Sequence, residues 1–331
     1  MELPSLQKEL IKRLSPGQFF SGQKLAHELG VSRTSVWNHL KSLEQLGFKL
    51  HAVKGKGTRL EKPMELLDKS ELALYSNQPR QGALSQLTLL GICTSTNDYL
   101  SQKNRQTPLV NGTVCLAEMQ TAGKGRLGRH WVSPYGQNIY MSFFWRFKNG
   151  LSTLAGLSLA CGVAVCSALQ ELGVKGHGLK WPNDILWHGK KLGGILVEIQ
   201  GESQSEYSAI IGIGINYDMG EKASEGIDQP WVDLANVKEG RVGRNKLAAM
   251  VIDKVLGVLK DYESTGLLPY VSDWNSFDCY HGEKVKILSG KTAIQGVAKG
   301  ISSTGELLLL RPNGQLEGIS SGEVSLRLDK P

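Results

Sequence analysis

The sequence predicts a multidomain protein with a mainly α N-terminal domain, a central α+β domain on a mixed or antiparallel sheet, and a small C-terminal β-barrel. The 331 residues are too many for one minimal domain. Apolar residues recur at helical spacing near the N-terminus and alternate in short runs near the C-terminus. Residues 1–63 hold eleven Lys and Arg against five Asp and Glu, and therefore nearly all of the formal net charge of +7. This concentration indicates a polyanionic partner for the first domain.

Three helices are predicted before residue 47. The first ends at Ser15-Pro16-Gly17. Ser21 caps the second helix, which ends at Gly30, and Ser32 caps the third. After Gly47 the chain predicts two short strands joined by a basic, glycine-rich turn. Together these elements form the pattern of a winged helix-turn-helix.

The third helix has a polar outer side that suits base edges and phosphates in a DNA major groove. We expect Arg33 and Asn38 to contact bases, and Lys54 and Lys56 in the wing to contact phosphates. The alternative is a small helical domain whose basic face mediates protein contact only. The predicted DNA-binding set is Ser32, Arg33, Thr34, Ser35, Trp37, Asn38, Lys54 and Lys56.

The composition of the whole chain is that of a globular protein, with 40% hydrophobic and 21% charged residues. An uncharged stretch between Lys148 and Glu171 approaches the length of a membrane span, but its many small residues predict a buried helix instead. Charges near the N-terminus argue against a signal peptide, so a cytoplasmic protein without membrane association is expected. The cysteines form no CxxC pair and are expected to be reduced thiols: Cys93, Cys115, Cys161, Cys166 and Cys279.

In the central region, strands are predicted at 113–117, 139–145, 184–186, 194–199 and 208–215, and a helix at 151–171. From Cys279 onward, short alternating runs and the hairpin signal Asn313-Gly314 predict the small barrel, for which a structural role is expected. The domain limits inferred from these patterns are 1–64, 65–278 and 279–331.

The loop from Gly123 to Arg129 interleaves three glycines with three cations. Glycine allows backbone N–H groups to turn toward an anion, and Lys and Arg supply the compensating charge, so the loop indicates a phosphate-bearing ligand. It has neither the GK[ST] ending of a Walker loop nor the following helix of a Rossmann fingerprint. A flexible basic surface loop is the alternative for this motif alone.

Two further clusters favour the ligand-binding interpretation of the loop over a surface loop. They are Lys180-Trp181-Pro182-Asn183-Asp184 and the run KKLGGILVE from Lys190 to Glu198. Together with Ser95-Thr96-Asn97, the GKGRLGR loop and the GIGIN run ending at Asn216, they resemble the biotin protein ligases. The added N-terminal domain makes the chain most similar to the bacterial bifunctional biotin ligases that also repress the biotin operon. The resemblance covers essentially the whole chain, and the motifs occur in the family's order.

The resemblance implies an ATP-dependent, AMP-forming ligase, with biotin as substrate and ATP with Mg²⁺ as cofactor. Such an enzyme forms biotinyl-5′-AMP and transfers biotin to a lysine of the biotin carboxyl carrier protein of acetyl-CoA carboxylase. By the same resemblance Lys191 contacts the reacting carboxylate and phosphate, and Arg126 belongs to a loop that closes over the adenylate. Asp184 positions Lys191 or holds Mg²⁺ through water, and no other metal ligand is inferred. The implied catalytic set is Lys191, Arg126 and Asp184.

The resemblance also implies two binding sets. Many relatives have arginine at the position of Lys124, which weakens the inference for that residue. Trp131 matches the tryptophan that stacks on adenine. The biotin set is Ser95, Thr96, Asn97, Gln120, Lys124, Gly125, Arg126 and Lys191, and the nucleotide set is Arg129, Trp131, Lys180, Asn183 and Asn216.

Regulation follows from the resemblance as well. The adenylate is expected to act as corepressor, to favour a homodimer, and to place two winged domains on a palindromic operator. The C-terminal barrel is expected to be SH3-like. Two alternatives remain at this point: a lipoate-type ligase, and a biotin-sensing regulator without catalysis.

Overall fold

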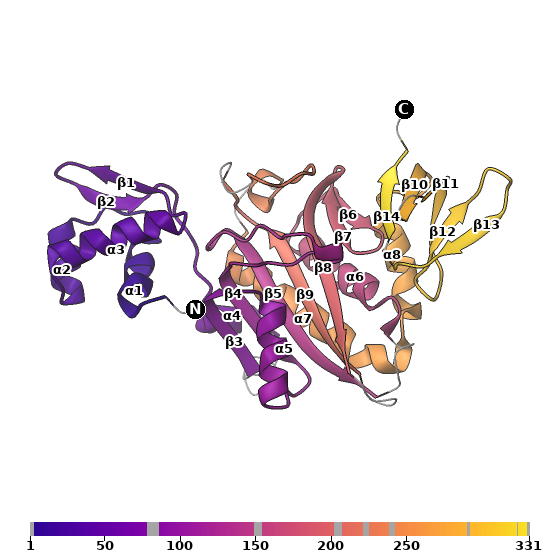
Figure 1. The fold of residues 1–331 in the computed structure, drawn as a ribbon, viewed down its shortest axis with the longest axis horizontal. Helices are drawn as coiled ribbons and strands as arrows, with labels where there is room; N and C mark the ends of the chain where they lie inside the picture. Colours follow the sequence, from indigo (N-terminus) through magenta and orange to yellow (C-terminus); the bar gives the residue numbers. More distant parts are fainter. Residues whose placement is uncertain are drawn as a thin grey trace.

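The computed structural model describes residues 3–77, 86–148, 154–201, 207–220, 225–237, 242–289, 292–322 and 324–329. Figure 1 shows three parts along the long axis of the molecule. A small helical part lies at one end, a larger sheet with helices lies in the middle, and a second, smaller sheet lies at the other end. The order of these parts follows the order of the chain.

The N-terminal part is a helix-turn-helix followed by a hairpin. Ser21 accepts a hydrogen bond from the backbone of Lys24, Ser32 accepts one from Ser35, and Gly30 ends its helix in the left-handed conformation at φ 66°. The three expected caps and the expected wing are therefore present. The elements are α1 (Ser5–Leu14), α2 (Gly22–Leu29), α3 (Arg33–Gln45), β1 (Leu50–Val53) and β2 (Gly57–Leu60), and the two strands pair antiparallel.

The central sheet is mixed, with seven strands in the order β3-β4-β5-β9-β8-β7-β6 among the described residues. The pair β3 and β4 is parallel, and the other pairs are antiparallel. The strands are β3 (Leu87–Cys93), β4 (Thr113–Gln120), β5 (Asn138–Phe147), β6 (His177–Lys180), β7 (Asp184–Trp187), β8 (Lys190–Gln200) and β9 (Tyr207–Asn216). The helices are α4 (Lys69–Tyr75), α5 (Thr96–Gln106), α6 (Leu157–Glu171), α7 (Arg244–Thr265) and α8 (Val271–Phe277).

Sequence reasoning missed both edge strands of this sheet and the helix α7. The β3 sequence LTLLGIC does not alternate, because apolar residues contact buried clusters on both of its faces, and β6 has only four residues. The helix expected at 151–171 begins at Leu157, and residues 151–153 lie outside the described part. The five strands that were expected are all present with ends that differ by a few residues.

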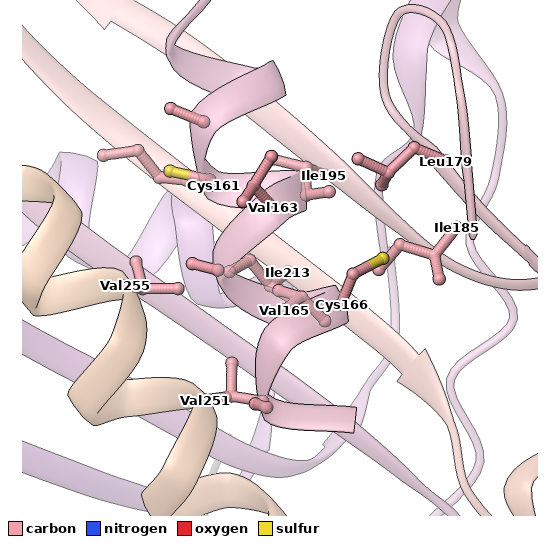
Figure 2. Packing of buried hydrophobic residues seen from close by; sticks show 14 of the residues in the cluster. Cys161, Val163, Val165, Cys166, Leu179, Ile185, Ile195, Ile213, Val251 and Val255 are labelled. Atoms are coloured by element: carbon pink, nitrogen blue, oxygen red, sulfur yellow. The ribbon is translucent and has the colours of Figure 1, made fainter. Parts of the chain in front are cut away.

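Helices cover both faces of the sheet. α6 and α7 pack together on one face, whereas α5 lies on the other face over β4, β5 and β9. Figure 2 shows the side chains of α6, among them Cys161, Val163 and Cys166, against strand residues and against α7. Burying each such apolar side chain stabilises the fold by roughly 1.5–3 kcal/mol relative to exposure.

The helix α6, which is uncharged up to its last residue Glu171, is thus a core helix, as the sequence predicts. Its 15 residues would extend about 22 Å at about 1.5 Å per residue, shorter than the roughly 30 Å hydrocarbon core of a bilayer. Over the described part of the chain, no helix is both long and apolar enough to cross a membrane.

The C-terminal part is a five-stranded antiparallel sheet in the order β13-β12-β11-β10-β14. Its core is continuous with that of the central part, since buried residues such as Val285 and Leu309 belong to the same apolar cluster as the central helices. Trp181 also donates a hydrogen bond from Nε1 to the carbonyl oxygen of Gly305 at 3.1 Å. The strands are β10 (Lys284–Ser289), β11 (Thr292–Ile301), β12 (Leu307–Leu310), β13 (Leu316–Ile319) and β14 (Val324–Leu328).

The helix-turn-helix also packs on the central part. The rings of Phe48 and Tyr135 lie 4.9 Å apart, and Ile92 belongs to the same buried cluster as the helices of the first domain. This contact places the DNA-binding pattern against the segment that follows the glycine-rich loop.

A buried ion pair fixes the chain between the two domains. Arg244, which is fully buried, donates from Nη1 to Glu118 at 2.5 Å and to the carbonyl oxygen of Glu65 at 3.1 Å. The same guanidinium donates from Nε and Nη2 to the carbonyl oxygen of Asn138. Glu118 also accepts a hydrogen bond from the backbone of Leu67 at 2.7 Å. The pair thereby joins the linker, β4 and the start of α7.

Candidate active site

A cavity of about 270 Å³ opens between the sheet, the glycine-rich loop and the C-terminal part. Every residue that the sequence predicts for catalysis, biotin binding or nucleotide binding lines this cavity, although these residues come from five separate segments of the chain. The predicted residues found there are Ser95, Thr96, Asn97, Gln120, Lys124, Gly125, Arg126, Arg129, Trp131, Lys180, Asn183, Asp184, Lys191 and Asn216.

One end of the cavity is uncharged and rich in hydrogen-bonding groups. The first turn of α5 begins at Thr96, whose backbone N–H and hydroxyl both donate to Oε1 of Gln120, at 2.8 and 3.2 Å. Gln120 in turn donates from Nε2 to the hydroxyl of Ser133 at 3.1 Å. These bonds fix the amide of Gln120 in one orientation, so this end presents a defined pattern of donors and acceptors.

Ser142 supports this end from outside the cavity lining, and sequence reasoning missed it. Its hydroxyl is fully buried and lies 2.6 Å from both the hydroxyl of Thr96 and Oδ1 of Asn97. It lies in the middle of the apolar strand β5. The one signal for it in the sequence is a single polar residue within a run of apolar ones, which needs a hydrogen-bond partner when buried.

Two glycines of the GIGIN run form the floor. A Cβ atom at Gly212 would lie 2.5 Å from Oδ1 of Asn97, and one at Gly214 would lie 2.6 Å from the ring of Trp131. Neither position can therefore carry a side chain without displacing a predicted ligand contact.

The other end is cationic. Asp184 lies between two lysines, with Oδ1 at 2.7 Å from Nζ of Lys191 and Oδ2 at 3.6 Å from Nζ of Lys180. Burial opposes the charge of Asp184, but Lys191 and Lys180 outweigh it, and the pKa of the carboxyl lies below its ordinary value. Burial lowers the pKa of Lys180, and Asp184 partly offsets this effect. Asp184 is therefore held ionised beside both lysines.

Both carboxylate oxygens of Asp184 face ammonium groups, so they do not fit direct ligation of a metal ion. Throughout the residues that the structure describes, no group of three or more His, Cys, Asp or Glu side chains could hold a metal ion. The arrangement fits Asp184 as a positioning residue for Lys191.

Arg126 lies in a short 3₁₀ turn, η2 (Arg126–Gly128), over the cavity. Its Nη2 donates to the carbonyl oxygens of Ser321 and Gly322, at 2.6 and 2.7 Å, and its Nη1 lies 3.4 Å from Oδ1 of Asn183. Burial lowers the pKa of Arg126, yet a guanidinium remains charged in proteins. The C-terminal part thus holds the predicted catalytic arginine in place.

The C-terminal part also contributes wall residues, which sequence reasoning did not assign. Val324, Ser325 and Leu326 on β14 line the cavity. The alternation of apolar residues along this strand predicts that it belongs to a sheet. It does not predict which other part of the molecule the sheet packs against, so it gave no signal for this role.

Two predicted nucleotide residues, Trp131 and Asn216, lie close to Lys191. Nζ of Lys191 lies 5.3 Å from the ring centre of Trp131, and Nε1 of Trp131 is buried without a protein acceptor among the described residues. Asn216 donates to the carbonyl oxygens of Lys191 and Val232, at 3.2 and 3.0 Å. Its amide nitrogen therefore supports the strand that carries Lys191.

The predicted DNA-binding residues lie together at the other end of the molecule. Arg33, Trp37 and Asn38 are exposed on α3, and Lys54 and Lys56 are exposed in the turn between β1 and β2. The Trp37 side chain is 55% exposed, and Nζ of Lys41 lies 3.9 Å from its ring centre. An exposed tryptophan beside a cation on one helix face suits a polyanionic surface.

Family descriptions match three segments of the chain. Residues 90–216 match the "Biotin/lipoate A/B protein ligase family", residues 6–59 match an "HTH domain", and residues 280–327 match the "Biotin protein ligase C terminal domain". The three matches follow the three parts of the structure.

Curated proteins and solved structures agree with these matches. The chain is 37% identical over 319 residues to the bifunctional ligase/repressor BirA of Escherichia coli, covering 96% of both chains. It is 33% identical over 329 residues to the bifunctional ligase/repressor BirA of Bacillus subtilis, covering 97% of this chain and 99% of that one. The structure resembles the biotin protein ligase from Aquifex aeolicus in complex with biotin and ATP, with a TM-score of 0.62 and 31% identity over 73% of this chain and 99% of that one.

Proposed function

The chain belongs to the biotin protein ligases, and from that premise we propose that it joins biotin to ATP, transfers the biotinyl group to an acceptor lysine, and represses transcription through its N-terminal domain. The observation that carries the proposal is one cavity with an uncharged, hydrogen-bonding end and a cationic end. Biotin has a polar ureido ring and a carboxylate, and the cavity suits both.

The first step needs fixed positive charge. A carboxylate oxygen of biotin attacks the α-phosphorus of ATP, and the bond to the departing pyrophosphate breaks. Negative charge accumulates in the process, so preorganised cations lower the barrier. Lys191 is the nearest cation to both anions in our assignment, Asp184 holds it in position, and Arg126 covers the adenylate. When bound, Mg²⁺ accompanies the phosphates of ATP and neutralises part of their charge.

The second step uses the acceptor's lysine as nucleophile. Its neutral amine attacks the acyl carbon of biotinyl-5′-AMP, AMP leaves with the bonding electrons, and the nitrogen loses one proton to water as the amide forms. The acceptor is the biotin carboxyl carrier protein of acetyl-CoA carboxylase. No nucleophile of this chain is required, because the mixed anhydride is already activated.

The binding roles are assigned by chemistry. Ser95, Thr96, Asn97 and Gln120 take the ureido ring, because they offer both donors and acceptors. Trp131 takes adenine, and Lys180, Asn183, Arg129 and Asn216 line the nucleotide side. Lys124 and Gly125 close over biotin as part of the loop.

The domain limits in this proposal are 1–64, 65–278 and 279–331, and the C-terminal sheet closes into an SH3-like barrel. The protein acts in the cytoplasm. It forms a homodimer when the adenylate is bound, since two winged domains on a palindromic operator require two copies. The adenylate is then the corepressor, and its coupling to DNA is reciprocal.

Pyrophosphate release tests the proposed activity. Purified protein is given ATP with biotin or with lipoate, and the rates are compared with ATP alone. Release that depends on biotin supports the ligase, whereas release that depends on lipoate indicates a lipoate-type ligase. A folded protein that binds biotin but releases no pyrophosphate is a sensor without catalysis.

Replacing Arg126 with alanine should let the adenylate escape. In the proposed role the guanidinium donates charged hydrogen bonds to the adenylate, each of roughly 1.5–3 kcal/mol. Loss of one such bond should raise the dissociation rate of the adenylate by roughly 10- to 100-fold. The rate is measured by trapping labelled adenylate that leaves the enzyme. The control is Arg105→Ala, an exposed arginine on α5 outside the cavity. An unchanged dissociation rate in Arg126→Ala contradicts the assigned role.

Substitutions in the winged domain should affect DNA binding in two different ways. Arg33→Ala should weaken operator binding by about 1–3 kcal/mol and relax base preference, because arginine reads base edges. Lys54→Ala should weaken binding to all sequences and reduce the slope of log affinity against log salt by about 0.9. Both are measured by fluorescence anisotropy with operator and scrambled duplexes at several salt concentrations. Lys49→Ala is the control, because Lys49 pairs with Glu61 within the domain.

A further inference from the structure

Glu198 on β8 stands between two groups that the proposed function uses. Its Oε2 accepts a hydrogen bond from Nδ2 of Asn97 at 2.7 Å, and its Oε1 lies 3.8 Å from Nζ of Lys124. Lys124 also forms an ion pair with Asp98, the residue that follows Asn97 on α5. Neither Glu198 nor Asp98 lines the cavity.

The bond to Glu198 decides which way the amide of Asn97 faces. An ionised carboxylate only accepts hydrogen bonds, so the NH₂ group of Asn97 must point toward it. Oδ1 of Asn97 is then directed to the buried hydroxyl of Ser142 and over Gly212. Without Glu198 the two ends of the amide are nearly equivalent in shape, and the amide can flip. A flipped amide would present a donor where the pocket now presents an acceptor.

Glu198 also helps to hold the glycine-rich loop. Lys124 is a cation of the loop that pairs with Asp98 on α5 and with Glu198 on β8. The hydrogen bond that Lys124 donates to Asp98 raises the pKa of Lys124 against the effect of burial, and the charge of Glu198 raises it further. If the loop lifts, Asp98 and Glu198 lose their shared counter-charge. Closing the loop and orienting Asn97 therefore depend on the same carboxylate.

We propose that Glu198 is a positioning residue for biotin recognition: it orients the amide of Asn97 toward the ureido ring and, through Lys124, holds the loop closed over the bound ligand. The proposal rests on the proposed function, because it takes biotin as the ligand of this end of the cavity. Its two arms involve different partners, so they can be measured separately.

The first arm is tested by a double-mutant cycle on biotin affinity, measured by calorimetry without ATP. Glu198→Ala should weaken biotin binding roughly tenfold, as expected for a lost charged hydrogen bond. In an Asn97→Ala background the same substitution should cost clearly less affinity, since only its effect through Lys124 remains. A merely structural role would instead give the same loss in both backgrounds, and that result would overturn the proposal. The control is Glu171→Gln, which removes a carboxylate from the exposed ion pair with Lys254.

The second arm is tested with the conservative variants Glu198→Gln and Asp98→Asn. Both remove a charge that faces Lys124, so both should speed dissociation of the adenylate several-fold, and high salt should reduce the difference from wild type. Asp98→Asn should weaken biotin binding by less than Glu198→Ala does, because the bond between Asn97 and Glu198 remains. Equal losses of biotin affinity in Asp98→Asn and Glu198→Ala, or unchanged dissociation in both charge variants, would contradict the assignment.

The wild-type measurement separates this inference from its premise. If wild-type protein does not bind biotin in the calorimeter, the proposed function fails. If wild type binds biotin and Glu198→Ala binds it equally well, the ligase assignment stands and the role of Glu198 is wrong.

Discussion

Lys191→Ala should reduce biotin-dependent pyrophosphate release by roughly 100- to 1,000-fold, the usual loss when a preorganised charge at the reacting centre is removed. Lys191 is mostly buried, and its Nζ lies 2.7 Å from Asp184. Without it, the ionised Asp184 would face two incoming anions with only Lys180, at 3.6 Å, beside it. The loss should appear in kcat more than in the biotin dissociation constant, because the cation acts on charge that develops during the reaction.

The neighbouring Lys190 provides a matched control. It is exposed and does not line the cavity, so Lys190→Ala removes the same charge from the adjacent position without reaching the reacting atoms. Its rate should equal that of wild type. Lys191→Arg should recover little activity, because a planar fork does not reproduce the compact charge of an ammonium group. If Lys191→Ala retains the rate of Lys190→Ala, Lys191 is not the catalytic cation.

Glu118→Ala should be the most destabilising single substitution among those considered. It leaves the fully buried Arg244 without its carboxylate, and breaking a buried pair in this way costs about 3–5 kcal/mol. The linker should loosen as well, because Glu118 accepts from the backbone of Leu67. The thermal unfolding midpoint, followed by tryptophan fluorescence, should fall by roughly 6 °C or more.

Glu171→Ala is the control for this prediction. Its ion pair with Lys254 is largely exposed, with side chains 51% and 38% accessible, and such pairs contribute about 0–1 kcal/mol. The two variants remove the same functional group from a buried and an exposed pair. A similar, small change in both would show that Arg244 finds other partners when Glu118 is absent.

The glycine-rich loop of the candidate site could be predicted from the sequence because its chemistry is local, whereas the binding sets around it rested on the family resemblance. A loop that binds an anion needs glycines beside cations within a few residues, as at Gly123 to Arg129. A helix start needs a cap next to it, as at Ser21 and Ser32. Such constraints act between neighbours in the chain, so residue type and spacing carry them. The same reasoning gave the helix-turn-helix and five strands of the central sheet.

The strands and partners that were missed depend on distant parts of the chain. The strand β3 is defined by its parallel pairing with β4, and its own sequence does not alternate. The wall that β14 adds to the cavity depends on how the C-terminal part packs, which alternation along a strand does not specify.

The sequence alone determined the residue types of the site, the order of its motifs and the three-part organisation of the chain. Tertiary structure decided the pairings. Glu198 meets Asn97 across 101 positions, and Arg244 meets Glu118 across 126. A carboxylate in a sequence carries no record of its partner, because electrostatic and hydrogen-bonding partners are selected by distance in the folded chain. The packing of α5 and the loop against β8 brings Glu198 next to Asn97 and Lys124, and this contact is what gives Glu198 its proposed role.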